Sequence, residues 1–314
     1  MSWRTVMPHL GSKWRKSESP LTQPVKAVRF LTRKTCAYSI GSCFAVNINR
    51  WLRHQGFEVP EVSWGNHYNS RTILYELRRA VGLPAPNVDW RVPNLDGVLA
   101  FGDALRHCVD TGSAEELAHL KAEIAADSRR IFSQAGAFLI TLGLSDSWEA
   151  EVDGEVITLN RAPYLGAELL NESVGDYVAN RFLTVDECVE DLRQIVGLIR
   201  AHKPAATPIV FSVSPVPLKH AGGNLHPHIA NSRSKATLLA AIFAFLDESA
   251  NDPYVSYFPA YEFFQTNPTQ MALWQSDDRH PTAEAVGYVA EKFLECYSNE
   301  KCSVRPGFTV PIFT

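Results

Sequence analysis

"CAYSIGSCFAVN", residues 36–47, places one glycine and two nucleophilic side chains between two regular elements. The apolar run AYSIG (37–41) is typical of a buried strand, and CFAVNINRWLRHQG (43–56) has apolar residues at helical spacing and ends in glycine. Ser42 therefore stands at the edge of a predicted sheet, beside the first-turn N–H groups of a helix, which suit a developing negative charge. A tight turn that needs Gly41 explains the same residues without any chemistry.

Further strands and helices alternate along the rest of the chain. Strands are predicted at 137–144, 208–215 and 255–261, and an Asp-Gly pair predicts a hairpin at 151–160. Helices are predicted at 71–82, 113–136, 186–202, 231–249 and 282–297, and residues 83–112 and 161–182 are predicted as loops. Such alternation implies a mostly parallel sheet with helices on both faces, a three-layer α/β/α fold.

We divide the chain into three parts. Residues 1–30 have little periodicity and form an irregular N-terminal arm, residues 31–300 form one α/β domain, and residues 301–314 form a C-terminal tail. Loop or hairpin insertions are predicted within the domain at 83–112 and 150–182.

Composition limits the classes of function. The 314 residues are 46% hydrophobic and 20% charged with a formal net charge of −4, which is ordinary for a globular protein and gives no reason to expect nucleic acid as a partner. The N-terminus lacks the apolar stretch of a signal peptide, and no run of about 18 apolar residues occurs. The six cysteines include no C-x-x-C pair, which argues against a zinc site and a disulfide framework. We therefore expect a cytoplasmic protein with no membrane span, and its oligomeric state is left open.

The chemistry of a parallel sheet gathers at the carboxyl ends of its strands. This rule brings four loops together: 41–43, 143–148, 214–228 and 275–281. In the last of them Asp277 and His280 are three residues apart before a helix, a spacing that lets the carboxylate fix the imidazole tautomer and leave the other nitrogen as a base. Alternatively, the aspartate only caps the helix and His280 is a surface residue.

The other loops offer supporting groups. Gly143 and Ser145 in TLGLSDSWE (141–149) follow a buried strand and could complete an oxyanion hole, with Trp148 as a cleft wall; the alternative is a plain turn with Trp148 in the core. Trp64 and Trp274 are further aromatic candidates near the cleft, although tryptophan is more often core.

Two other features are ambiguous. Cys43 is a rival nucleophile, because a thiol at a helix N-terminus can have a lowered pKa. The loop KHAGGNLHPH (219–228) holds three histidines without acidic residues at ligand spacing, so exposed histidines are a better interpretation than a metal site. Alternatively this loop, with Arg233 and Lys235 beyond it, binds a polar or anionic substrate.

At this point the chain resembles a known family. GSCFA (41–45) is the name-giving motif of the GSCFA proteins, a bacterial family placed near the SGNH (GDSL-like) hydrolases, and the similarity covers roughly residues 35–297. Further stretches also resemble it: NSRTILYEL (69–77), TLGLSDSWE (141–149), SVSPVPL (212–218), NSRSKATL (231–238), YFPAYE (257–262) and DDRHP (277–281). The resemblance implies a flavodoxin-like parallel sheet and a Ser-His-Asp site that acts on ester or acyl groups, often of carbohydrates.

The site residues implied by the resemblance follow the motifs. Ser42 matches the nucleophile of the first block, and Asp277 and His280 match the D-x-x-H block. GLSD (143–146) falls where the superfamily has G-x-N-D, so Ser145 replaces an asparagine that donates to the oxyanion. The second-block glycine has no clear match; Gly65 or the neighbourhood of Asn69 is the candidate.

Together these interpretations predict an SGNH-like serine hydrolase or acyltransferase. Ser42 would be the nucleophile, His280 the base and Asp277 its partner, with Cys43, Gly143 and Ser145 as oxyanion donors. Asn69, Trp148 and Arg233 are the substrate-binding candidates. We expect a small-molecule or carbohydrate substrate, no metal and no bound cofactor, with acetyl-coenzyme A as a candidate acyl donor. The alternative is a glycan- or ligand-binding protein on a decayed hydrolase scaffold.

Overall fold

A four-stranded, fully parallel sheet forms the centre of the computed structural model. The structure describes residues 28–93, 99–107, 109–160, 168–169, 174–222, 224–300 and 305–312. The strands are β1 (Ala37–Gly41), β5 (Ala137–Leu142), β10 (Ile209–Val213) and β11 (Val255–Tyr257), in the order β1-β5-β10-β11. All four are buried, as strands covered on both faces must be.

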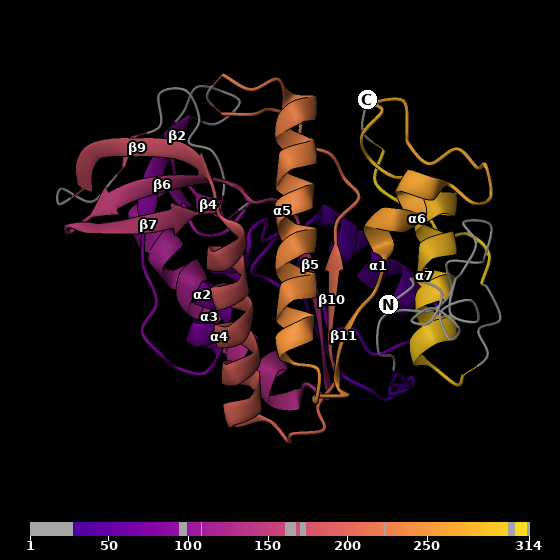
Figure 1. The fold of residues 1–314 in the computed structure, drawn as a ribbon. Coiled ribbons are helices and arrows are strands. Elements are labelled where there is room, and N and C mark those ends of the chain that lie inside the picture. The colour runs from indigo at the N-terminus through magenta and orange to yellow at the C-terminus, as the bar shows by residue number, and fades with distance from the viewer. Residues whose placement is uncertain are drawn as a thin grey trace, which may run out of the picture.

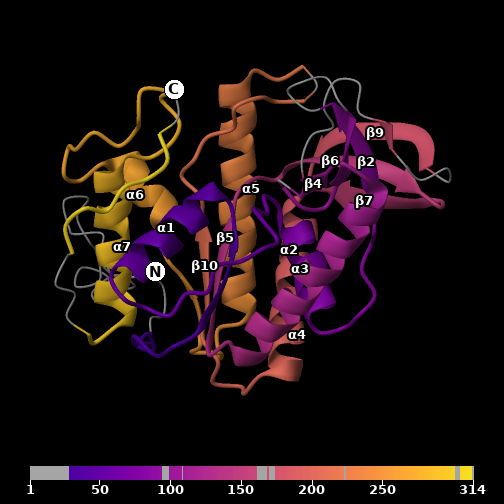
Figure 2. The same cartoon turned by 180° about the vertical axis from the view of Figure 1, so that it is seen from behind.

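Helices cover the two faces of this sheet, which confirms the predicted three-layer α/β/α class (Figure 1). One face is covered by α2 (Ser70–Ala80), α3 (Ala114–Gln134), α4 (Val185–His202) and α5 (Pro227–Glu248). The other is covered by α1 (Cys43–His54), α6 (Ala260–Thr266) and α7 (Ala283–Tyr297), as Figure 2 shows from behind. Alternate strand residues feed the two cores: Phe138 and Ile140 point to the first, and Leu139 points to the second.

Most predicted elements are present with small changes of boundary. The helices begin where side chains cap them: Ser42, Asn69, Ser113, Thr184 and Thr282 are N-caps of α1, α2, α3, α4 and α7. The Asp153-Gly154 hairpin also forms, with positive φ at both residues, between β6 (Asp146–Val152) and β7 (Glu155–Leu159).

Two predictions of loops were wrong. Within 83–112 the chain forms β2 (Asp89–Pro93), β3 (Leu99–Asp103) and β4 (Asp110–Thr111), which join β8 (Glu168–Leu169) in an antiparallel sheet. Within 161–182 it forms β9 (Val174–Phe182), which pairs with β6. Residues 83–112 are rich in Pro, Gly, Asn and Asp, which are typical of loops, yet β2, β3 and β4 pair with one another as short neighbouring strands. The pairings of β2 with β8 and of β9 with β6 join more distant segments, which no local pattern reveals. Helix α6 was also missed, because its first residues continue the apolar run that follows β11.

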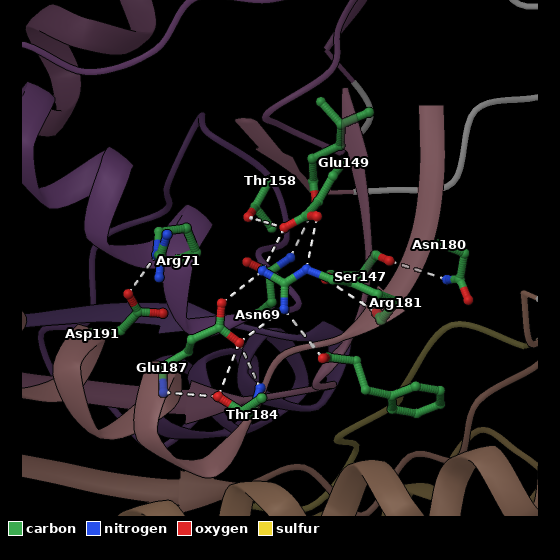
Figure 3. Close-up of polar contacts among 12 residues, drawn as sticks. Asn69, Arg71, Ser147, Glu149, Thr158, Asn180, Arg181, Thr184, Glu187 and Asp191 are labelled. Atoms are coloured by element: carbon green, nitrogen blue, oxygen red, sulfur yellow. Dashed lines mark hydrogen bonds and ion pairs between the residues drawn. The ribbon is translucent and has the colours of Figure 1, made fainter. Parts of the chain in front are cut away.

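A charged network ties the β6–β7–β9 sheet to the start of α4 (Figure 3). The guanidinium of Arg181 donates to Glu149 at 2.7 Å and to both carboxylate oxygens of Glu187 at 2.7 and 2.8 Å. Glu187 in turn closes a capping box with Thr184. In Figures 1 and 2 the two small sheets gather at the end of the molecule far from α7.

The chain ends fall partly outside the described residues. Of the predicted arm, residues 1–27 are not described, and Phe30 and Leu31 donate to the carbonyl of Tyr297. Of the predicted tail, residues 301–304 and 313–314 are not described. Over the described ranges, no helix has the length and apolar character that crossing a membrane requires.

Candidate active site

The turn between β1 and α1 holds Ser42 in a fixed place. Gly41 has φ +151°, and a Cβ built on it would lie 2.2 Å from the carbonyl oxygen of Thr141 in the neighbouring strand. Only glycine therefore fits at this position. Ser42 is 3% exposed, and its Oγ accepts the N–H of Phe44 at 3.3 Å as the cap of α1. The chain thus presents a serine at the carboxyl end of a central strand, as predicted.

Asp277 and His280 form the predicted pair. Asp277 Oδ2 lies 2.5 Å from His280 Nδ1, and Oδ1 accepts the backbone N–H groups of Arg279 at 3.1 Å and His280 at 2.9 Å. Burial disfavours the charged carboxylate, but these hydrogen bonds outweigh it and lower the pKa of Asp277 to about 2. A permanently ionised carboxylate therefore faces the imidazole at neutral pH.

Arg279 settles the tautomer of His280. Its Nη1 lies 3.1 Å from His280 Nε2, and its Nε donates to the carbonyl of Pro217 at 3.0 Å. A guanidinium has donors only, so Nε2 must be the acceptor and Nδ1 must carry the proton that it donates to Asp277. This is the tautomer that a general base needs. The sequence analysis did not single out Arg279; its place between Asp277 and His280 was the only available signal.

Lys235 is a second cation that the sequence analysis underrated. It is 1% exposed on α5, and its Nζ donates to the carbonyl oxygen of Gly143 at 2.7 Å. Burial lowers the pKa of Lys235 to about 7. Gly143 itself lies against the nucleophile turn, because a Cβ built on it would be 3.4 Å from Ser42 Cβ. A lysine facing the apolar side of a long helix was the signal for this position.

Contacts and charge interactions link all four of the predicted loops. Gly143 abuts Ser42, Arg279 reaches Pro217, and the charges of Arg279 and Lys235 act on the Cys43 thiol. The convergence expected from the strand ends is therefore present.

The predicted oxyanion donors are only partly in place. The N–H of Gly143 donates to the carbonyl of Tyr68 at 2.9 Å, so it is already engaged. Ser145 is fully buried, and both its N–H and its hydroxyl bond to Ser234 of α5. Both groups are engaged in holding the loop in this structure, and their roles as oxyanion donors stay predictions. Cys43 remains, since its N–H belongs to the first helical turn, which has no intrahelical acceptor.

The predicted substrate contacts also change. Asn69 is 1% exposed; its side chain accepts the N–H of Thr72 and donates to the carbonyl of Leu159, which makes it a structural cap. Trp148 lies within β6 and packs on the core between the small sheets, so it is not a loop residue. Arg233 is exposed, with its guanidinium 4.2 Å from the centre of the Phe182 ring.

Two tryptophans and Cys43 also differ from prediction. Trp64 is fully buried and stacks on Tyr38, and Trp274 packs on Phe264. Burial raises the pKa of the Cys43 thiol, although Arg279 and Lys235 lower it in part. A thiol that is mostly protonated at neutral pH is a poor nucleophile, which favours Ser42.

The histidines of the 219–228 loop are exposed, as predicted, and His226 caps α5. In the described part of the chain no group of His, Cys, Asp or Glu side chains is arranged to hold a metal ion.

Comparison with protein families identifies the chain. The family model described as "GSCFA family" matches residues 37–293, and the chain belongs to this family. No curated protein matches the chain.

Proposed function

We propose that this member of the GSCFA family is an SGNH-like serine hydrolase or acyltransferase that acts on ester or acyl groups, with acylated carbohydrates as its substrates. The observation that carries the proposal is the Asp277–His280 pair, whose tautomer leaves Nε2 as a base in the loop that meets the Ser42 turn. A buried serine at a strand end, a helix N-terminus beside it and an oriented histidine are the parts that acyl transfer requires.

The reaction would proceed in two steps. Ser42 Oγ attacks the acyl carbonyl while His280 Nε2 takes its proton, and Asp277 stabilises the resulting imidazolium. The N–H of Cys43 and the dipole of α1 stabilise the negative oxygen of the tetrahedral intermediate. The intermediate expels the alcohol, which receives the proton from His280, and leaves an acyl group on Ser42. Water or an acceptor hydroxyl then gives its proton to His280 and removes the acyl group.

One contact in the structure must change before this reaction starts. The single lone pair of Nε2 accepts from Arg279, so it cannot at the same time accept the proton of Ser42. Ser42 Oγ accepts from Phe44, although its own proton remains available for donation. The structure therefore corresponds to a resting arrangement of the site, in which Arg279 covers the base.

The fate of the acyl-enzyme depends on the acceptor. Transfer to a sugar hydroxyl and hydrolysis share the same first step, and neither needs a bound cofactor. Acetyl-coenzyme A is a candidate for the acyl donor, which is a substrate of this first step. Measuring acylated product with and without added sugar separates the two outcomes: transfer consumes the donor faster when the acceptor is present.

A fluorophosphonate probe tests the proposed nucleophile. It should label the wild-type protein at Ser42 with loss of fluoride, as located by peptide mass spectrometry, and label Ser42→Ala not at all. His280→Gln should slow labelling strongly, because the base that takes the serine proton is gone. Cys43→Ala is the matched control, because it removes the thiol next to Ser42 and keeps Ser42 itself. This variant should be labelled as wild type is.

The binding-protein alternative rests on one observation, the engagement of Gly143 and Ser145 within the loop. Losing an oxyanion donor typically costs about 10²–10³ in turnover. A wild-type protein that the probe leaves unlabelled, but that binds acylated sugars, would favour this alternative.

A further inference from the structure

Two cations meet at the Ser42 turn without a carboxylate of their own. In the described ranges neither Arg279 nor Lys235 forms an ion pair; their hydrogen-bond partners are the Pro217 carbonyl and His280 Nε2 for Arg279, and the Gly143 carbonyl for Lys235. Asp277 is close in sequence, but its carboxylate accepts from the His280 ring and from two backbone N–H groups. The nearby Asp278 is exposed.

Burying these two cations without an anionic partner costs desolvation free energy, which a bound anion would offset. A fully buried ammonium usually has a carboxylate partner, because desolvation of a lone charge is expensive. The charges of both cations act on the Cys43 thiol and lower its pKa in part. The first turn of α1 adds the positive end of a helix dipole at the same place. The groups around the nucleophile therefore favour an anion.

Arg279 also opposes the reaction in its present place. A guanidinium 3.1 Å from Nε2 blocks the lone pair and repels the imidazolium that forms when Ser42 loses its proton. Arg279 is half-buried, and within the described residues the other hydrogen bond of its guanidinium runs from Nε to Pro217, so its outer nitrogens can turn toward a new acceptor. A carboxylate or phosphate would be such an acceptor, because its oxygens match the guanidinium fork.

We propose that the substrate of the Ser42 site carries an anionic oxygen group, a carboxylate or phosphate, beside the reacting ester, and that Arg279 binds this group and in doing so uncovers His280. Lys235 adds a second positive charge behind the loop and holds the Gly143 carbonyl. This proposal rests on the proposed function and assigns its substrate class: an acylated acid, such as an acylated sugar acid or sugar phosphate. With a neutral ester, Arg279 would stay on Nε2 of His280, and the reaction would be slow.

A matched pair of esters tests the selectivity. We would measure kcat/KM for 4-acetoxybenzoate and for the neutral 4-acetoxybenzamide at constant ionic strength, in wild type, Arg279→Gln and Arg279→Lys. Wild type should prefer the benzoate by about tenfold or more, the size expected for one charged hydrogen bond. Arg279→Gln should lose this preference through a slower benzoate reaction, with the benzamide unchanged or faster because Nε2 is released. Arg279→Lys should retain part of it.

Controls distinguish recognition of the substrate's charge by Arg279 from a general loss of activity in the variant. Arg129→Gln removes an exposed arginine on α3 and should behave as wild type. The proposal is overturned if wild type shows no preference for the benzoate, or if Arg279→Gln slows both esters equally. Inhibition of the benzoate reaction by inorganic phosphate or by acetate, compared at equal concentration, shows which anionic group the site prefers.

A binding measurement keeps this proposal distinct from the proposed function. Titration of Ser42→Ala with inorganic phosphate in a calorimeter should show binding that is about tenfold weaker in Ser42→Ala/Arg279→Gln. Equal affinity in the two proteins, or no binding in either, would overturn the anion site. If the fluorophosphonate and both esters fail to react with wild type, the proposed function is wrong. The phosphate titration alone then decides whether Arg279 binds an anion.

Discussion

At the scale of single residues, the chemistry of donors and acceptors decides the state of the site. Arg279 can only donate, so its contact with Nε2 fixes both the lone pair of His280 and the proton on Nδ1. Asp277 holds the ring and the backbone of the same turn. One carboxylate thus positions the imidazole of His280, and one guanidinium covers its Nε2.

Lys235 makes stability depend on pH. Its folded pKa is about 7 and its ordinary value is 10.5, so between these values the unfolded chain binds more protons than the folded one. Stability therefore rises with pH through this window, by up to about 1.4 kcal/mol per pH unit, and the contribution is constant below pH 7. Lys235→Met should remove this slope. Urea unfolding of both proteins from pH 7 to 10 measures it; parallel curves would show that Lys235 does not titrate there.

Gly41 is the residue on which the nucleophile turn depends. Gly41→Ala places a methyl group 2.2 Å from the Thr141 carbonyl at a φ that L-residues avoid, so β1 and β5 must separate. We expect a loss of at least about 1–3 kcal/mol in the free energy of unfolding and a loss of Ser42 labelling. Gly82→Ala is the matched control, because Gly82 has φ +75° with nothing within 4 Å. Equal losses in the two variants would show that the Thr141 contact does not matter.

Some residues of the candidate site could be predicted from the sequence, and others could not. Ser42, Asp277 and His280 were predicted because each lies in a short local pattern next to a helix start. Arg279 was given no role, and Lys235 was named only as a candidate contact of a polar or anionic substrate, because their places depend on contacts with Pro217 and Gly143 from distant segments. The engagement of Gly143 and Ser145 was not visible for the same reason: their partners, Tyr68 and Ser234, lie in other segments of the chain.

At the scale of elements, a buried ion network joins α2 to the chain after β3. Arg106 donates to Glu76 at 2.8 Å and to Asp103 at 3.0 Å, and all three side chains are almost fully buried. Burial raises the pKa of Glu76, but the charges of Arg106 and Arg79 outweigh it and bring the pKa down to about 2. Glu76 therefore stabilises the fold above its ordinary pKa of 4.5, and this contribution is lost as the pH falls toward 2.

Removing the central cation of this network should be severe. Arg106→Met removes the arginine that Asp103 and Glu76 share and leaves Glu76 with Arg79 as its remaining arginine, and we expect a loss of about 3–5 kcal/mol in the free energy of unfolding at pH 7. Arg193→Met is the control, because the Arg193–Glu248 pair is exposed and should contribute little. Urea unfolding of both variants checks this. A loss for Arg106→Met as small as the control's would mean that water or rearrangement compensates the carboxylates.

Elements were predicted well where their pattern is local. Capping side chains and helical spacing placed α1, α3, α4 and α7 within a few residues. The strands β2, β3 and β4 pair with their neighbours along the chain, but they were missed because the segment is rich in Pro, Gly, Asn and Asp, which are typical of loops. Strand β2 also pairs with the distant β8, and the missed strand β9 pairs with β6. Such pairing is decided by the packing of Trp90 and its neighbours in a third core, which composition alone does not show.

At the scale of the whole molecule, the two cores on either side of the sheet hold the strand ends in one place. The 41–43 turn and the 275–281 loop flank α1 and α7 on one side, and Lys235 reaches the same edge from α5 on the other. The site is therefore assembled from both helical layers, and the alternation of strands and helices was enough to predict where it lies.

The intact mass of the protein after incubation with 4-nitrophenyl acetate tests the central claim most directly. Wild type and Cys43→Ala should gain one acetyl group, and Ser42→Ala should gain none, because Ser42 Oγ is the proposed acyl carrier. Acetyl-coenzyme A as a second donor would show which acyl donor the site accepts. An adduct that persists in Ser42→Ala and disappears in Cys43→Ala, or no adduct on any of the three proteins, would contradict the serine mechanism.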